Sequence, residues 1–117
     1  MKSKASGPQI GKPVRGSTTG KPIMVVLDLL GRKSTLRVLW ELRGGNPYKF
    51  RELQAAADTN PSLLNTRLRE LRDAGIVSHD GAGYALTGEG MSLLDALHPL
   101  SEWAVEWGKN RMDNVSE

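Results

Sequence analysis

Apolar residues recur every three or four positions along the first part of the chain, a spacing typical of amphipathic helices. The first predicted helix begins at Pro22, since the first helical turn tolerates a residue without an N–H, and it ends at Gly31. Its apolar face is predicted to consist of Ile23, Val26, Leu27 and Leu30.

A second helix is predicted from Ser34 to Arg43, with Ser34 as its N-terminal cap and a stop at residues 44–47. Its predicted buried side comprises Leu36, Leu39, Trp40 and Leu42. Residues 48–50 are expected to add a short edge strand. Residues 51–57 are expected to form a short helix that ends in a turn at residues 58–60.

The clearest helix signal follows this turn. Asn60 is a typical N-cap, Pro61 suits the first helical position, and Gly75 suits the residue after the helix end. The apolar positions that should face the core are Leu64, Leu68 and Leu71.

A β-hairpin and a long helix are predicted for the rest of the chain. Residues 76–79 and 84–86 read as strands, and the Asp-Gly-Ala-Gly turn between them favours a hairpin. Thr87 should cap the last helix, in which Pro99 predicts a kink. Its apolar stripe comprises Leu93, Leu94, Leu97, Leu100, Trp103, Ala104 and Trp107. The expected fold class is therefore α+β, mostly α: a winged helix-turn-helix with a short hairpin wing and added N- and C-terminal dimerisation helices.

Length and composition limit what this fold does. A chain of 117 residues forms one domain, here residues 22–111, between a disordered basic tail (1–21) and a flexible end (112–117). It has no cysteine and two histidines, so we expect no disulfide, no metal site, no cofactor and no catalytic residues. No apolar run approaches a membrane span or a secretory signal, so a cytoplasmic location is predicted.

Charge is segregated along the sequence. Residues 1–21 carry five cations and no acid, and residues 31–72 carry nine cations against four acids. Residues 73–117 carry eight acids against two cations. A basic middle and an acidic end favour one surface that faces an anion and one that is turned away, although uneven scatter of solvated charge gives the same count.

The outward face of the helix at Pro61 carries residue types suited to DNA bases, because Arg pairs with guanine, Asn with adenine, and Ser or Thr with several partners. The candidate base-contacting residues are Ser62, Asn65, Thr66 and Arg69. The candidate phosphate contacts are Lys49, Arg51, Arg67, Arg72 and His79. Without the helix-turn-helix and hairpin around it, a solvated helix face would be the favoured interpretation of Arg67, Arg69 and Arg72 with Glu70.

Two regions leave alternatives open. The hairpin tip at residues 80–83 has an acid and no cation, so it is expected to add little direct readout. The basic tail fits either an arm along DNA or an inert segment, with the inert reading slightly favoured. The C-terminal stripe fits a helix that covers its own core, but symmetric dimerisation explains its length better. The predicted dimer interface is Ile23, Val26, Leu27, Leu30, Leu97, Leu100, Trp103 and Trp107.

From residue 22 to residue 109 the chain resembles the HxlR-type family of bacterial and archaeal transcriptional regulators. The matching segments, in order, are residues 29–33, 39–42, 50–53, 61–71, 75–77, 86–90, 93–94 and 102–103. The resemblance implies a dimeric winged helix-turn-helix, with dimer contacts from the first and last helices. It also implies that the helix at Pro61 recognises DNA.

Three positions depart from the family pattern. Lys21 stands where many members have a cysteine, which removes thiol sensing of that kind. Ser34 replaces a tryptophan, so the packing beneath the second helix must differ. The wing is shortened to residues 80–83, which puts its DNA contacts in doubt.

The predicted function is sequence-specific binding of double-stranded DNA by a homodimeric transcriptional regulator, on a two-fold-related operator. The alternative is a winged-helix module that binds a partner protein without sequence-specific DNA binding. Preference for one duplex sequence separates the two. No residue pattern in the sequence indicates a small-molecule effector.

Overall fold

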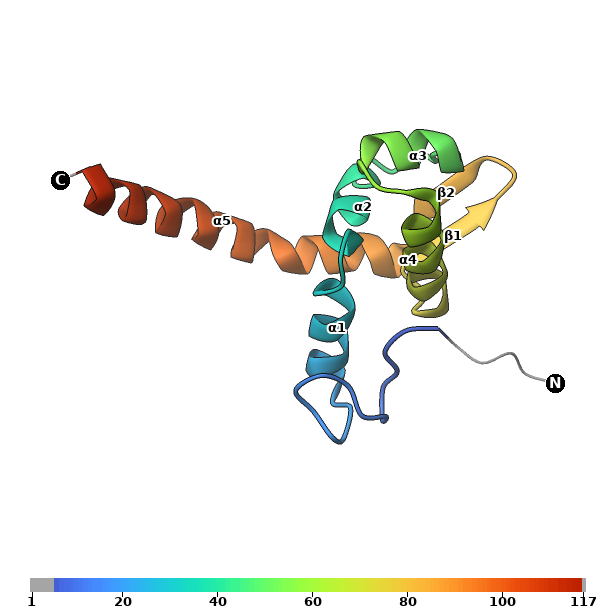
Figure 1. Cartoon of the computed structure of the whole chain (residues 1–117), viewed down its shortest axis with the longest axis horizontal. Coiled ribbons are helices and arrows are strands. Elements are labelled where there is room, and N and C mark those ends of the chain that lie inside the picture. The colour runs from blue at the N-terminus through green and yellow to red at the C-terminus, as the bar shows by residue number, and fades with distance from the viewer. Residues whose placement is uncertain (1–5, 117) are drawn as a thin grey trace.

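The computed structural model describes residues 6–116 and has the predicted α+β, mostly helical architecture. Its helices are α1 (Pro22–Leu30), α2 (Thr35–Glu41), α3 (Phe50–Ala56), α4 (Pro61–Asp73) and α5 (Gly88–Ser116). Its strands are β1 (Val77–Asp80) and β2 (Gly83–Leu86). Helices α2–α4 and the hairpin gather at one end, while α1 and the outer part of α5 extend away from them in different directions (Figure 1).

The helix-turn-helix is formed by α3 and α4, and the local signals at α4 are confirmed. The Asn60 side chain accepts a hydrogen bond from the Leu63 N–H at 2.8 Å, with Pro61 in the first turn. Gly75 has a φ of 77°, the left-handed conformation that favours glycine after a helix end. The three leucines predicted to face the core are all buried.

Helix α2 differs from its prediction. It is shorter than residues 34–43, and Ser34 has a φ of 73° and makes no capping bond. Its hydroxyl instead donates to the Thr59 hydroxyl at 3.4 Å. Leu36 and Trp40, predicted to be buried, are more than half exposed, while Val38 is fully buried. Helical spacing explains the change, since positions four apart share a face and the face of Leu36 and Trp40 is turned from the core.

The edge strand expected at residues 48–50 is reduced to a single pair. Tyr48 and Tyr84 exchange backbone hydrogen bonds of 2.9 and 2.8 Å, and α3 begins directly afterwards at Phe50. The hairpin itself is confirmed, with Val77 opposite Leu86 and Asp80 opposite Gly83. Gly83 has a φ of 128°, and a Cβ there would overlap the Tyr48 carbonyl. Glycine is therefore required where the two segments meet.

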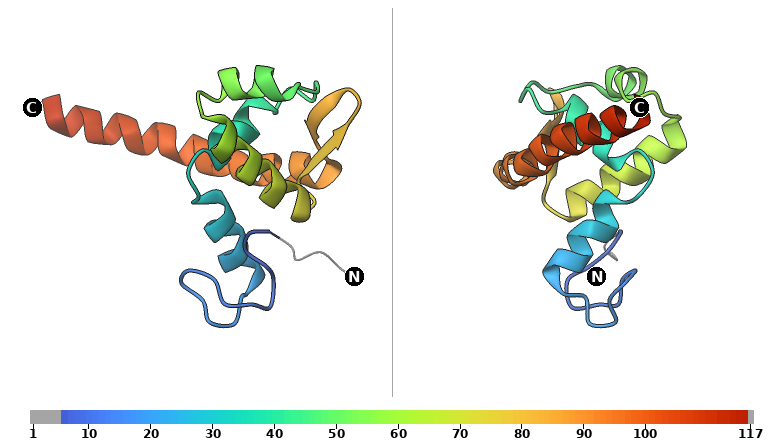
Figure 2. Two further views of the ribbon diagram at one scale, coloured as in Figure 1. Left: turned by 45° about the vertical axis from the view of Figure 1, so that its right-hand side comes forward. Right: turned by 90° about the vertical axis from the view of Figure 1, so that its left-hand side faces the viewer.

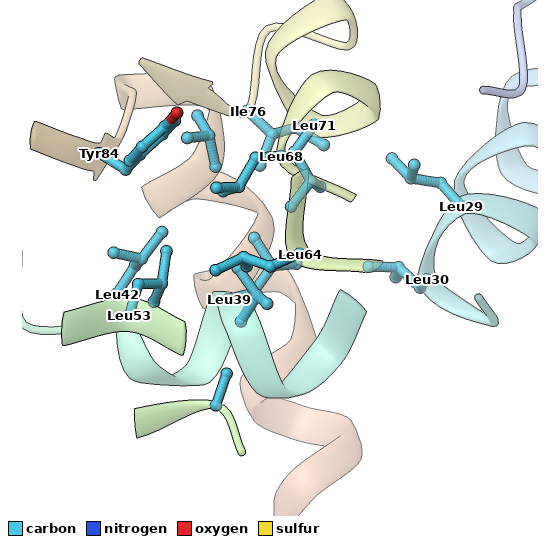
Figure 3. Close-up of a cluster of buried hydrophobic side chains, with 13 residues drawn as sticks. Leu29, Leu30, Leu39, Leu42, Leu53, Leu64, Leu68, Leu71, Ile76 and Tyr84 are labelled. Carbon is cyan, nitrogen blue, oxygen red and sulfur yellow. The ribbon is translucent and has the colours of Figure 1, made fainter. Parts of the chain in front are cut away.

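The core lies between α2, α3, α4 and the hairpin (Figure 3). Leucines from α2, α3 and α4 meet in its centre, and Ile76, Val77 and Tyr84 close it on the hairpin side. Leu29 and Leu30 reach its edge from α1, apart from the central leucines (Figure 3). The fold is thus built around α4, which contributes Leu64, Leu68 and Leu71.

Helix α5 packs on this core only through its first half. Thr87 caps it, since its hydroxyl accepts a hydrogen bond from the Gly90 N–H at 3.0 Å. Leu93, Leu94 and Leu97 are half-buried against the core, whereas Leu100 and the residues beyond it leave the body of the molecule (Figure 2). The helix runs through Pro99 without interruption, so the proline produces no break.

Residues 6–20 form a looped segment beside α1, without helix or strand, where the sequence predicted disorder. The Gly11 N–H donates to the Gly20 carbonyl at 3.0 Å, and Val14 and Ser17 exchange two backbone hydrogen bonds. Arg15 bonds Asp28 of α1 at 3.1 Å. The remaining tail residues of that prediction, 1–5, lie outside the described part of the chain.

Candidate nucleic-acid interface

The solvent face of α4 carries the four predicted base-contacting residues. Ser62, Asn65, Thr66 and Arg69 are all exposed, because the leucines of the opposite face are held in the core. The Thr66 hydroxyl donates to the Ser62 carbonyl at 3.1 Å, a bond within the helix that leaves the oxygen at the surface. The row therefore lies on one accessible face, with its N-terminal end at the turn.

Two of the predicted phosphate contacts, Arg51 and Arg72, and one predicted base contact, Arg69, are unpaired cations. Arg51, Arg69 and Arg72 are exposed, and within residues 6–116 their side chains have no hydrogen bond or ion pair. Such side chains can meet an incoming anion without first giving up a protein partner. Because Arg69 and Arg72 are three residues apart on α4, they lie close to the same face of the helix.

Arg67 is separated from this exposed group. Its side chain is only 14% exposed, and its guanidinium donates to the Lys33 carbonyl and to Glu70, both at 2.8 Å. The sequence placed it with the other arginines because the helix bears four charged residues in a row of six. The partners lie 34 and 3 residues away, and only the fold brings Lys33 to it.

The interior side of α4 carries a buried ionic network. Glu70, 5% exposed at its side chain, pairs with Arg67 and with Arg32 at 2.6 Å. Arg32 also lies 3.6 Å from Asp28, which Arg15 contacts from the N-terminal segment. Burial would raise the pKa of Asp28, but the hydrogen bond from Arg15 and the charge of Arg32 outweigh it and lower that pKa below its ordinary value.

The hairpin tip acquires a cation that its own sequence lacks. The Lys49 ammonium donates to the Gly81 carbonyl at the turn, 32 residues further along the chain. Asp80 accepts a hydrogen bond from the Ala82 N–H at 2.8 Å, so its carboxylate is engaged within the turn. The His79 ring stacks on Tyr84, with 4.0 Å between ring centroids. The short edge strand predicted at residues 48–50 was the signal that could have located Lys49, had the hairpin been identified as its partner.

The predicted dimer residues fall into two groups. Ile23, Leu27 and Leu100 are exposed, as are Trp103 (60%) and Trp107 (52%), whose rings stack with centroids 5.7 Å apart. Val26 and Leu97 are half-buried against the core, and Leu30 is buried in it. The exposed members therefore form unpaired apolar surface on α1 and on the outer part of α5, whereas Leu30 has a place in the core of its own chain.

Other kinds of site have little support among the described residues. Nowhere in residues 6–116 do three or more His, Cys, Asp or Glu side chains gather in a way that could hold a metal ion. No helix in this part of the chain has both the length and the apolar content needed to cross a membrane.

A helix-turn-helix whose second helix is capped, cationic and followed at once by a hairpin is the arrangement of winged-helix transcriptional regulators. Comparison with known proteins specifies the family. The family model described as HxlR-like helix-turn-helix matches residues 29–112, and the chain belongs to that family. The resemblance given by the sequence motifs is thereby confirmed.

Two relatives are bacterial and archaeal regulators. The chain is 26% identical over 97 residues to the uncharacterized HTH-type transcriptional regulator MJ0925 of Methanocaldococcus jannaschii, which covers 79% of this chain and 91% of that protein. It is 30% identical over 89 residues to the uncharacterized HTH-type transcriptional regulator YvaP of Bacillus subtilis, and this match covers 69% of this chain and 82% of that protein. The family and these relatives are transcriptional regulators rather than enzymes.

A solved structure shares the fold. The crystal structure of quinone-bound YodB from B. subtilis superposes with a TM-score of 0.68 at 26% identity, covering 73% of this chain and 97% of that chain. The protein is thus a DNA-binding transcriptional regulator of the HxlR-like family with a two-stranded wing.

Proposed function

We propose that the protein acts as a homodimer that recognises a two-fold-related operator in double-stranded DNA and regulates transcription by occupying it in the cytoplasm. The observation that carries this proposal is the α4 face, on which Ser62, Asn65, Thr66 and Arg69 are accessible while Leu64, Leu68 and Leu71 fix the helix to the core. A helix held in this way can enter a major groove with its polar face first.

Phosphate contacts would surround this face. Arg51 and Arg72 are free to bind the DNA backbone, and Lys49 would bring a positive charge to the wing tip. His79 lies on the same hairpin, stacked on Tyr84, and would contribute least. Arg67 would serve the DNA indirectly, because its guanidinium is already bonded to Glu70 and Lys33.

Dimerisation is supported by the apolar residues that the single chain leaves open. Exposed apolar residues grouped along one face of a helix mark a protein interface more often than apolar residues scattered singly. A two-fold dimer through α1 and α5 would present two copies of α4 about one DNA turn apart. Val26 and Leu97 would take part only at the edge of such an interface.

The alternative is a winged-helix module that binds a partner protein without reading a DNA sequence. The acidic C-terminal third favours it, since eight of the acids lie from residue 73 onward. Because the chain has no cysteine, an effector that acts by modifying a thiol has no target in it.

Fluorescence anisotropy on duplex DNA separates these functions. The purified protein is titrated into duplex from upstream of its own gene and into a scrambled duplex of equal length, at low and near-physiological salt. A preference of roughly a thousandfold that survives the higher salt supports the operator. Equal binding that fades with salt would indicate nonspecific contact, and no binding at either salt would favour the protein-partner alternative.

A further inference from the structure

Helix α1 joins the core through a small apolar contact, and charged groups connect the segment that follows it to α4. Leu29 and Leu30 reach the edge of the core from α1 (Figure 3). Apolar contacts of this kind are non-directional, so they fix the separation of two helices better than their angle. Directional contacts to α4 come from Arg32 and Lys33, just beyond the Gly31 that ends α1.

Those contacts form a two-point clamp, which we define as Arg32, Lys33, Arg67 and Glu70. One oxygen of the Glu70 carboxylate accepts from Arg32 at 2.6 Å, and the other accepts from Arg67 at 2.8 Å. Arg67 also donates to the Lys33 carbonyl at 2.8 Å. Arg32 and Lys33, which follow Gly31 at the end of α1, are therefore both bonded to α4, Arg32 through its side chain and Lys33 through its backbone carbonyl.

The clamp is shielded from solvent, which makes its geometry stringent. The side chain of Glu70 is 5% exposed, and that of Arg32 is 28% exposed. Charge-assisted hydrogen bonds strengthen where water is excluded, and a buried carboxylate that loses a partner is costly. The network therefore resists rotation of α4 against α1 more than an apolar contact of the same size would.

Its position gives the clamp a consequence for DNA. Glu70 follows Arg69 directly in α4, so the clamp holds the inner side of the helix whose outer side carries the candidate base contacts. At its other end is α1, which bears the exposed Ile23 and Leu27 of the proposed dimer surface. The clamp thus lies between the proposed dimer surface of α1 and the recognition helix.

We propose that the Arg32–Glu70–Arg67 clamp sets the angle between α1 and α4 and thereby determines which spacing between operator half-sites the dimer accepts. Arg32 and Glu70 are positioning residues in this account and do not touch DNA. The inference rests on the proposed function, since spacing has meaning only for a dimer that reads two half-sites.

The test compares Arg32→Gln with Arg37→Gln. Both variants lose one positive charge, but Arg37 pairs with Glu41 inside α2 and with the Ala56 carbonyl, away from α4. Wild type and both variants are used to select duplexes from a random library. Affinities are then measured for duplexes with the selected half-sites at the preferred spacing, at spacings changed by one or two base pairs, and for one half-site alone.

The clamp predicts a specific pattern. Wild type and Arg37→Gln should lose about tenfold or more in affinity when the spacing is changed, and Arg32→Gln should lose less than about threefold. The selected half-site sequence and the affinity for a single half-site should be unchanged in Arg32→Gln. A purely structural role would lower its thermal stability and leave the spacing preference intact.

Several outcomes would overturn the inference. One is a wild-type spacing profile in Arg32→Gln, and another is an altered half-site sequence, which would make Arg32 part of base recognition. If Arg32→Gln does not fold by circular dichroism, Arg32→Lys, which keeps the charge without the guanidinium fork, gives the same readout. Failure of the wild type to select any sequence would refute the proposed function and the clamp with it, whereas failure of the variant test alone leaves the regulator intact.

Discussion

Two regions of the molecule differ in how far their apolar residues are buried. We call residues 35–86 the recognition unit, and α1 together with residues 98–113 of α5 the helical arms. In the recognition unit, the central leucines of α2, α3 and α4 are fully buried, and among its large apolar residues only the outward-facing Leu36 and Trp40 of α2 are more than half exposed. On the arms, Ile23, Leu27, Leu100, Trp103 and Trp107 are more than half exposed. The recognition unit completes its core within a single chain, whereas the helical arms expose apolar surface that is suited to contact with another protein surface.

The two regions also extend differently in space. The recognition unit is a cluster of short helices and a hairpin, whereas α5 continues well beyond it and gives the molecule a longest dimension of 61 Å (Figure 1). A long helix with one half on the core and one half off it is stabilised by tertiary packing only at its inner end. The outer half therefore gains most from association with another chain.

The largest effect is expected from truncating a central leucine of the recognition unit. Leu68→Ala should lower the free energy of unfolding by about 2–5 kcal/mol, because it empties a site that no solvent reaches. Urea denaturation followed by circular dichroism measures this loss. Leu36→Ala, at an exposed leucine, is the control and should cost far less. An equal loss in both would show that Leu36 is covered in the folded protein.

Truncation of an arm tryptophan should affect association instead of folding. Trp103→Ala removes one ring of the stacked pair and should weaken dimerisation by about 2–4 kcal/mol, as truncation of a central interface aromatic does. Sedimentation equilibrium gives the dissociation constant. Val105→Ala, also exposed on α5 but off the tryptophan stripe, should leave that constant unchanged. A monomeric wild type would contradict the assignment of the arms to a dimer.

Within the recognition unit, two arginines of α4 should differ in kind. Arg69→Ala should cost about 1–3 kcal/mol at one base pair and relax the preference there. Arg72→Ala should weaken all sequences alike and reduce the slope of log affinity against log salt by about 1. Anisotropy titrations on single-base variants of the selected duplex distinguish them. A changed base preference in Arg72→Ala would reverse the two roles.

The smallest expected effect concerns Asp28 of α1, whose side chain is 3% exposed. Its pKa in the folded protein lies below the ordinary value of 3.8, so its ionised form stabilises the fold above that pH. Asp28→Asn should lower the free energy of unfolding by about 1–2 kcal/mol near pH 7, since two arginines lose a charged partner.

This difference should shrink as the pH falls through the folded-state pKa of Asp28, because wild type then also carries a neutral side chain. Urea denaturation at pH 7, 5 and 3 measures it. Asp95→Asn, at an exposed acid of α5, should show no such pH dependence. A difference between wild type and Asp28→Asn that stays constant with pH would show that the charge is not what stabilises the fold.

Much of the fold could be predicted because its signals are local. The cap at Asn60, the proline after it, the glycine at residue 75 and the leucine spacing between them act within a few residues, and all were confirmed. The hairpin was found for the same reason, within one residue at each strand. The α2 prediction was wrong where several helix faces looked apolar, since Leu36 and Trp40 were placed inside.

For the candidate site, the sequence predicted the exposed face of α4 but not the partners of Arg67. Placing Leu64, Leu68 and Leu71 in the core leaves residues 62, 65, 66 and 69 on the solvent side, as periodicity requires. Arg67 lies at the boundary between these faces, and periodicity alone does not say whether such a cation meets solvent or a buried partner. The exposed apolar stripe on α5 was likewise visible in the sequence, while the point at which it leaves the core was not.

The sequence by itself determined the start and stop of α4, the hairpin, the family and the outward row on α4, because capping, turn conformation and side-chain periodicity depend on neighbours along the chain. Only the tertiary structure decided that Arg32 and Glu70, 38 residues apart, share a buried ion pair, and that Lys49 lies at the tip of the hairpin. Pairing across such separations depends on where the packed helices place each side chain, and that placement is a property of the assembled core.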